Sequence, residues 1–169
     1  ATAYWNHYWR WKADQRQNGQ RTQAIHNFIA TDKLKPWKKL YFVIKKDHRG
    51  RSYPYGSAIS YQGNDHTQSQ LTFNRAAPIA GNEKHLIWAI GEAWGVQPDW
   101  EQRYEFFGVN EERLVTCGQR ELDVIGWWER AKKPWRFVSL CRELARFKDD
   151  YQYRTRLPFR LDQTCSAYG

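Results

Sequence analysis

The chain has 169 residues, of which 41% are hydrophobic and 17% aromatic, and it carries a net charge of +9. This length suits one domain or parts of two, and the hydrophobic content is enough for a folded core. The absence of an apolar run near 18 residues argues against a transmembrane helix, and three cysteines without Cys-x-x-Cys spacing argue against a structural zinc site and favour reduced thiols in a soluble, cytosolic protein.

The positive charge is distributed unevenly along the chain. Residues 1–60 contain 12 Lys and Arg against three Asp, whereas residues 61–169 contain 15 of each sign. A basic segment joined to a neutral one indicates a surface that faces a polyanion. Membrane-surface binding is the competing interpretation, and it is weaker because no basic amphipathic helix with a clean apolar face is present.

The N-terminal region is predicted to be helical. Residues 3–17 place aromatic side chains at helical spacing, and Asn18-Gly19 is expected to end that helix. Residues 21–31 show a second apolar face of the same period. We expect two helices followed by a short connector.

A basic turn between two extended runs comes next. The runs are residues 40–44 and 53–61, and the glycine between them allows close approach of the backbone to a ligand. Four cations lie within seven residues: Lys45, Lys46, Arg49 and Arg51. This pattern is typical of an anion-binding turn, although from composition alone a solvated basic hairpin tip is the alternative.

The neutral part of the chain is predicted to be mostly helical. Asn82 is a plausible N-cap, Gly95 ends the helix that follows, and Asp99-x-x-Gln102 forms a capping box. Packing is the expected role of the many aromatic residues here. The predicted helices cover residues 66–74, 82–94, 99–107, a segment from 110, 119–131 and 135–147.

The last predicted element is a strand. Residues 156–161 alternate between apolar and basic side chains, which is the period of a strand. Asp162 follows directly, so its carboxylate is expected at the end of a rigid element.

Several segments form an ordered set of motifs: Asp47-x-x-Gly50-Arg51-x-Tyr53, Tyr61-Gln62-Gly63-Asn64-Asp65 with Thr67, Pro78-Ile79-Ala80-Gly81, Trp127-Trp128 and Leu157–Ser166. Through these motifs and their order, residues 25–169 resemble the single-subunit, phage-type RNA polymerases of phages and mitochondria. Several ordered motifs are more specific than one short pattern.

The resemblance implies an α+β fold that forms part of a right-hand polymerase palm, with a helical palm insertion and helices from the base of the thumb. The implied organisation is a thumb-base-like helical part (1–37), a palm segment with the Asp-x-x-Gly-Arg motif (38–75), a helical block like the palm insertion (76–153) and the motif A strand (154–169).

The resemblance also implies a function, template-directed nucleotidyl transfer by two Mg²⁺ ions. Asp162 takes the motif A position, so it is the expected catalytic residue and metal ligand. The backbone carbonyl of Gln163, where the family usually has glycine, is the second expected ligand. The expected nucleic-acid-binding residues are Arg51, which would hold the template, with Arg49, Gly50, Tyr53, Lys45 and Lys46, while Asp47 is expected to brace the loop.

Motifs B and C of the family, with the lysine and tyrosine that meet the nucleotide and the second catalytic aspartate, do not occur in the sequence. We therefore expect a chain that is inactive alone and needs a second polymerase subunit to act on a DNA template, an RNA–DNA hybrid and nucleoside triphosphates. It would be either a natural subunit or a fragment, in the cytoplasm of an infected host cell or in the virion, and ribose selection would lie outside this chain.

Two alternatives remain open at this stage. One is a non-catalytic nucleic-acid-binding or scaffold protein derived from a polymerase, which would have little reason to keep Asp162. The other is a relative of DNA polymerases, which share the palm. The Asp-x-x-Gly-Arg and Gln-Gly-Asn-Asp segments favour an RNA polymerase.

Overall fold

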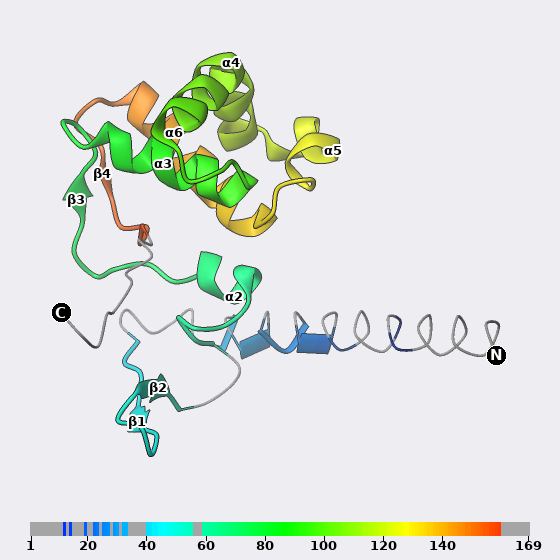
Figure 1. Cartoon of the computed structure of the whole chain (residues 1–169), viewed down its shortest axis with the longest axis vertical. Coiled ribbons are helices and arrows are strands. Elements are labelled where there is room, and N and C mark those ends of the chain that lie inside the picture. Colours follow the sequence, from blue (N-terminus) through cyan, green and yellow to red (C-terminus); the bar gives the residue numbers. More distant parts are fainter. Residues whose placement is uncertain are drawn as a thin grey trace. The chain divides into compact units, whose positions relative to one another are not determined.

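The computed structural model describes residues 12, 14, 19, 22–23, 25–27, 29–30, 32–33, 40–55 and 59–159. The chain divides into two compact units, residues 1–68 and residues 69–169 (Figure 1). Helices dominate, and two small antiparallel sheets of two strands each accompany them. The predicted α+β class is therefore confirmed.

The described residues between 12 and 33 are helical, and Gly19 is one of them. The predicted helix end at Asn18-Gly19 is therefore wrong at Gly19. A single glycine inside a helix costs only about 1 kcal/mol relative to alanine, so it does not break a helix that is otherwise favourable.

The Gln-Gly-Asn-Asp segment builds the start of helix α2 (Asp65–Ser69), which is shorter than the predicted residues 66–74. The Asn64 side chain accepts hydrogen bonds from the backbone N–H (2.9 Å) and hydroxyl (2.8 Å) of Thr67, as an N-cap does. A Cβ on Gly63 would lie 3.1 Å from the Thr67 side chain. The buried Asn27 amide also donates to the Thr67 hydroxyl. This part of the motif therefore has a structural role in the first unit.

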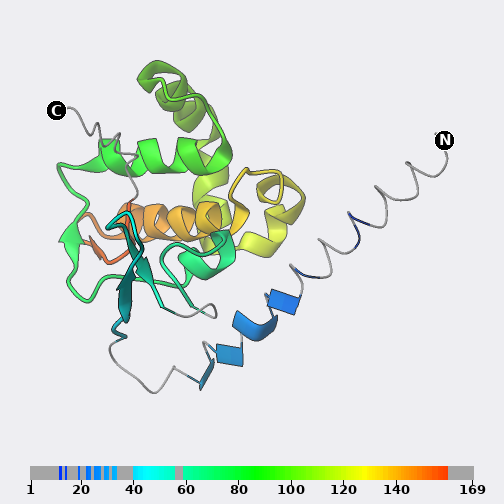
Figure 2. The same ribbon diagram turned by 60° about the horizontal axis from the view of Figure 1, so that its bottom comes forward.

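The second unit is a helical block with one small sheet (Figure 2). Helices α4 and α6 pack against each other most extensively, and α3 contacts both. The elements are β3 (Ala77–Pro78), α3 (Glu83–Trp94), α4 (Trp100–Gln119), the 3₁₀ helix η1 (Glu121–Val124), α5 (Ile125–Trp128), α6 (Pro134–Asp149) and β4 (Arg154–Thr155).

Aromatic side chains form the centre of this block. The Trp94 ring lies 5.3 Å from Phe106, 5.0 Å from Trp127 and 5.2 Å from Phe137, measured between ring centroids. Trp127 is 8% exposed and Phe137 is fully buried. The packing role that was predicted for aromatic residues is thus confirmed for these four, each of which buries a large apolar area.

Helix α3 begins and ends at the predicted residues, but the Asn82 side chain does not form the hydrogen bond of an N-cap. Asn82 precedes its first residue, and its backbone N–H donates to Ile79 over 2.7 Å in a turn that places Gly81 at a φ of +77°. Gly95 follows the last residue at a φ of +108°, and its N–H donates to Gly91 over 3.0 Å. Both glycines adopt the left-handed conformation, which other residues enter only at a cost.

Helix α4 runs without interruption where two helices were predicted. Asp99 caps it through the N–H of Glu101 (3.1 Å) rather than that of Gln102. Asn110, which was expected to start a new helix, donates its side-chain amide to the Phe106 carbonyl (2.8 Å) within the helix. Leu114 and Cys117 continue the buried face beyond Gly108. The continuous apolar face therefore keeps α4 helical through Gly108 and Asn110, although both residues are common at helix boundaries.

Two other predicted elements need correction. In place of one helix over 119–131, the chain forms η1 and the short α5. The predicted strand over 156–161 is not formed at 156–159, and β4 instead pairs with β3 just before it. Leu157 and Phe159 still pack against the core. A sequence can therefore alternate between apolar and polar residues because single side chains pack against the core, even where the segment does not pair with another strand.

Candidate nucleic-acid interface

The basic turn is the tip of a β-hairpin in the first unit. Strand β1 (Ile44–Lys46) pairs antiparallel with β2 (Ser52–Pro54), and Lys45 lies opposite Tyr53. Strand β1 overlaps the predicted extended run at 40–44 only at Ile44, and β2 overlaps the run at 53–61 only at Tyr53 and Pro54. The second run turns at Tyr55, and its residues 56–58 lie outside the described part of the chain.

Asp47 holds the turn together. One of its carboxylate oxygens accepts the backbone N–H groups of Arg49 (2.8 Å) and Arg51 (2.9 Å). The backbone N–H of Asp47 donates to the Arg51 carbonyl (2.9 Å), and that of Gly50 donates to the Asp47 carbonyl (3.0 Å). Gly50 has a φ of +76°, where a side chain would be strained. The backbone that carries the cations is thus fixed by one carboxylate and one glycine.

The cations of the hairpin face solvent. Lys45, Lys46, Arg49 and Arg51 are all exposed, and among the described residues none of them forms an ion pair with a carboxylate. Cations without an ion-pair partner attract a polyanion more strongly than paired cations do.

Aromatic rings lie beside these cations. Tyr53 is half-buried and faces Lys45 across the ladder, and the Lys45 ammonium lies 5.6 Å from the ring centroid of the exposed Tyr55. Arg51 lies in the turn directly before β2, two positions from Tyr53. The hairpin therefore combines positive charge with flat apolar surface, which suits a nucleic-acid strand.

The predicted metal ligands Asp162 and Gln163 lie outside the described residues. Within the described part of the chain, no group of three or more His, Cys, Asp or Glu is arranged to hold a metal ion. The buried Cys117 and Cys141 are free thiols.

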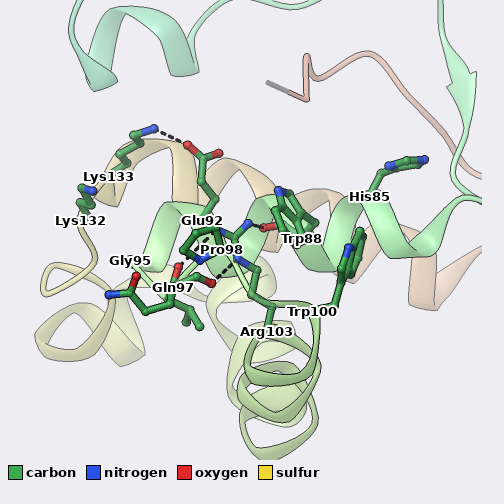
Figure 3. A pocket seen from close by; sticks show the side chains of 11 residues that line it. His85, Trp88, Glu92, Gly95, Gln97, Pro98, Trp100, Arg103, Lys132 and Lys133 are labelled. Atoms are coloured by element: carbon green, nitrogen blue, oxygen red, sulfur yellow. Dashed lines mark hydrogen bonds and ion pairs between the residues drawn. The ribbon is translucent and has the colours of Figure 1, made fainter. Parts of the chain in front are cut away.

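A cleft in the second unit was not predicted from the sequence. It has a volume of about 680 Å³, and Figure 3 shows its lining side chains. Trp88 and Glu92 come from α3, Trp100 and Arg103 from the first turns of α4, and Lys132 and Lys133 from the segment before α6.

Arg103 fixes the two helices that line the cleft. Its guanidinium donates to the backbone carbonyls of Gln97 (2.9 Å), Trp88 (3.0 Å) and Val96 (3.3 Å), and it lies 3.8 Å from the centroid of the Trp88 ring. Burial lowers the pKa of Arg103 below its ordinary value, and the Glu92 carboxylate partly opposes this shift. Arg103 remains charged at neutral pH, since an arginine starts from a very high pKa.

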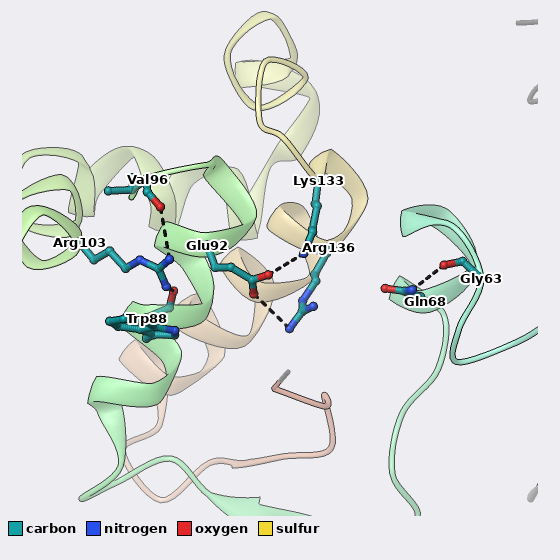
Figure 4. A network of polar contacts seen from close by, with 8 residues as sticks. All are labelled: Gly63, Gln68, Trp88, Glu92, Val96, Arg103, Lys133 and Arg136. Atoms are coloured by element: carbon teal, nitrogen blue, oxygen red, sulfur yellow. Dashed lines mark hydrogen bonds and ion pairs between the residues drawn. The ribbon is translucent and has the colours of Figure 1, made fainter. Parts of the chain in front are cut away.

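Glu92 forms ion pairs with one cation just before α6 and one in its first turn. Its carboxylate lies 2.5 Å from the Lys133 ammonium and 3.7 Å from the Arg136 guanidinium (Figure 4). The backbone N–H groups of Lys132 and Lys133 also donate to the carbonyls of Trp94 (3.0 Å) and Ala93 (2.9 Å) at the end of α3. The wall of the cleft is therefore connected by hydrogen bonds to the core.

Sequence reasoning missed the cleft because its residues come from three segments that no motif joins. The sequence contained one weak indication. Trp88 does not share the helical face of the buried Leu86 and Ile90 in α3, so its large aromatic ring lies away from the centre of the core. Nothing in the sequence indicated that Arg103 would be buried beside it.

Comparison with known proteins identifies the class. Residues 84–168 match the family model of DNA-dependent RNA polymerases. The chain is 29% identical over 137 residues to the mitochondrial DNA-directed RNA polymerase of Schizosaccharomyces pombe, a match that covers 77% of this chain and 12% of that protein. The corresponding enzyme of Neurospora crassa is 29% identical over 75% of this chain and 9% of its own length.

A phage enzyme is similar over more of the chain. The T7 RNA polymerase of Escherichia phage T7 is 28% identical over 161 residues, which are 93% of this chain and 18% of that protein. The chain belongs to the phage-type DNA-dependent RNA polymerase family, and it spans less than a fifth of the length of these three relatives. Among the described residues, no helix is long and apolar enough to cross a membrane.

Proposed function

We propose that this chain is the template-holding part of a DNA-directed RNA polymerase and supplies one carboxylate of its metal site. The β1–β2 hairpin would grip the template and the RNA–DNA hybrid through Arg51, Arg49, Lys45 and Lys46. Further polypeptide with motifs B and C, from a second subunit or from the rest of a longer chain, would complete the enzyme. For a phage enzyme the setting is the cytoplasm of the infected cell.

One observation carries the proposal: in a chain of this family, an exposed cluster of cations stands on a backbone turn that is fixed by Asp47 and Gly50. A turn with a fixed backbone presents its cations at constant spacing, so less conformational entropy is lost when phosphates bind. Arginine suits this role because its planar guanidinium donates two parallel hydrogen bonds to a phosphate.

The proposed metal ligands are the Asp162 carboxylate and the Gln163 carbonyl. Both are hard oxygen donors of the kind that Mg²⁺ prefers. When bound, the ion would supply charge stabilisation for the transferring phosphate. In this chain, Asp162 would contribute the negative charge that holds it, while the hairpin would position the template independently.

Arg51→Ala tests the hairpin's role. We expect weaker binding of a template–primer duplex and a salt dependence of log K that is lower by about one unit, since one phosphate contact is lost. Binding would be followed by fluorescence anisotropy at several salt concentrations.

Arg142→Ala is the control, because it removes the same charge from the exposed ion pair with Glu121 in the second unit. This variant should leave the salt dependence unchanged. An equal loss of affinity from Arg142→Ala, with none from Arg51→Ala, would refute the assignment of template binding to the hairpin.

A further inference from the structure

The cleft between α3 and α4 presents an aromatic surface that the core does not use. The Trp100 ring contacts Trp88, with ring centroids 4.3 Å apart and planes inclined at 48°, yet Trp100 remains 43% exposed. By contrast, Trp127 and Trp128 in the same unit are each only 8% exposed. A large ring that is held in place by a neighbour, but left open to solvent, is suited to stacking against a flat ligand.

The aromatic pair is rigidly supported. Trp88 is fixed by the guanidinium of Arg103, which also bonds three backbone carbonyls around the cleft. A Cβ on Gly91 would lie 2.8 Å from the Arg103 side chain, so α3 and α4 approach closely behind the cleft. Because these side chains are already held in place, less conformational entropy would be lost when a ligand binds.

Positive charge lies at the other end of the cleft, as Figure 3 shows. Lys132 is exposed, its stem lies 3.3 Å from a Cβ placed on Gly95, and it has no ion-pair partner among the described residues. Lys133 pairs with the carboxylate of Glu92. Among the side chains that line this end of the cleft, two lysines against one carboxylate leave a positive charge.

We propose that this cleft is a second nucleic-acid site, which holds a short single-stranded segment with a base stacked on Trp100 and a phosphate near Lys132. A duplex keeps its bases within the helix, so an exposed ring selects unpaired bases. An acidic peptide would satisfy the lysine but would leave the Trp88–Trp100 surface without a flat partner. The inference rests on the proposed function for its choice of a polynucleotide, and it adds a contact surface in the neutral half of the chain.

Photo-crosslinking locates the contact directly. The probe is a six-nucleotide thymidine oligomer with one central 5-iododeoxyuridine, which is irradiated with the full chain and mapped by peptide mass spectrometry. We expect an adduct on the peptide that contains Trp100. Trp100→Ala should reduce the total adduct from the second unit about fivefold or more, as loss of one stacking platform would.

Trp135→Ala is the matched control, because Trp135 is 49% exposed in the same unit but lies outside the cleft. It should leave the adduct in the cleft unchanged. Lys132→Ala alters an exposed side chain and keeps Trp100, so a lower yield from this variant supports the site even if Trp100→Ala folds poorly. An unchanged yield from Lys132→Ala, or equal competition by polyglutamate of the same charge, would overturn the proposal.

The experiment separates this inference from the proposed function. An adduct on residues 40–55 reports the hairpin, and an adduct on Trp100 reports the cleft. An adduct on the hairpin alone would overturn the second site and leave the proposed function standing. An adduct on Trp100 alone would support the second site and count against the hairpin.

Discussion

Asp47 organises the backbone of the loop that is proposed to hold the template. Its carboxylate lies among four cations, so its charge should weaken attraction to a phosphate backbone. It also accepts two backbone N–H groups, from Arg49 and Arg51, which fixes the backbone of the turn at both arginines. The electrostatic and the structural contributions of this residue to template binding therefore have opposite signs.

Asp47→Asn and Asp47→Ala separate the two contributions, since both remove the same charge. Asparagine keeps an oxygen that can accept the two N–H groups, whereas alanine does not. We expect Asp47→Ala to bind template about five- to tenfold more weakly than Asp47→Asn, which corresponds to the net value of about 1 kcal/mol for a hydrogen bond. Anisotropy titrations at one fixed salt concentration would measure this ratio. Equal affinities would mean that the carboxylate does not hold the loop.

The residues of the basic turn could be predicted from the sequence because the pattern that indicates the turn lies within a few consecutive residues. A glycine among cations between two extended runs is enough to predict a basic turn, and the turn is present. Arg103 could not be predicted in the same way. Its burial depends on carbonyls at Trp88, Val96 and Gln97, which are brought together only when α3 and α4 pack.

At the scale of elements, the contact between α4 and α6 is the most extensive between helices of the second unit. A Cβ added to Gly118 in α4 would lie 2.1 Å from the backbone carbonyl oxygen of Cys141 in α6, and 2.8 Å from Ala145. Backbone atoms cannot rotate away from such a clash as a flexible side chain can. The two helices therefore require glycine at this position.

Gly118→Ala should destabilise the protein by about 3 kcal/mol or more, because it forces α4 and α6 apart. Gly108→Ala is the control in the same helix, since a Cβ there meets nothing within 4 Å. That substitution should stabilise by up to about 1 kcal/mol, as alanine favours the helix. Urea unfolding of the two variants measures both free energies. A Gly118→Ala variant as stable as the Gly108→Ala variant would contradict the packing described here.

The prediction of elements succeeded where caps and glycines mark their ends and failed where the chain continues through a weak signal. Gly95 ends α3 as predicted, whereas Asn82 precedes its first residue without a side-chain capping hydrogen bond. Helix α4 was divided in the prediction because Gly108 and Asn110 are typical of helix boundaries, but its buried face continues to Cys117. Only the tertiary contact with α6 determines that outcome.

At the scale of the whole molecule, the distribution of charge agrees with the division into two units. The basic excess belongs to residues 1–60, within the first unit, and the neutral remainder includes the second. Family membership follows from ordered motifs along the sequence and from the match over residues 84–168. Assignment of the metal site still depends on Asp162, so catalysis is the part of the account that most needs a direct test.

The most direct test is single-turnover nucleotide addition to a preformed primer–template scaffold, with Mg²⁺ and a saturating polypeptide that carries motifs B and C. We expect no extension by this chain alone and extension by the mixture. Asp162→Asn should assemble and bind template normally but extend the primer at least about a hundredfold more slowly, as for loss of a central charge-stabilising group, whereas Asp149→Asn should be near neutral. Extension by Asp162→Asn at the wild-type rate would contradict the account and favour a non-catalytic nucleic-acid-binding protein.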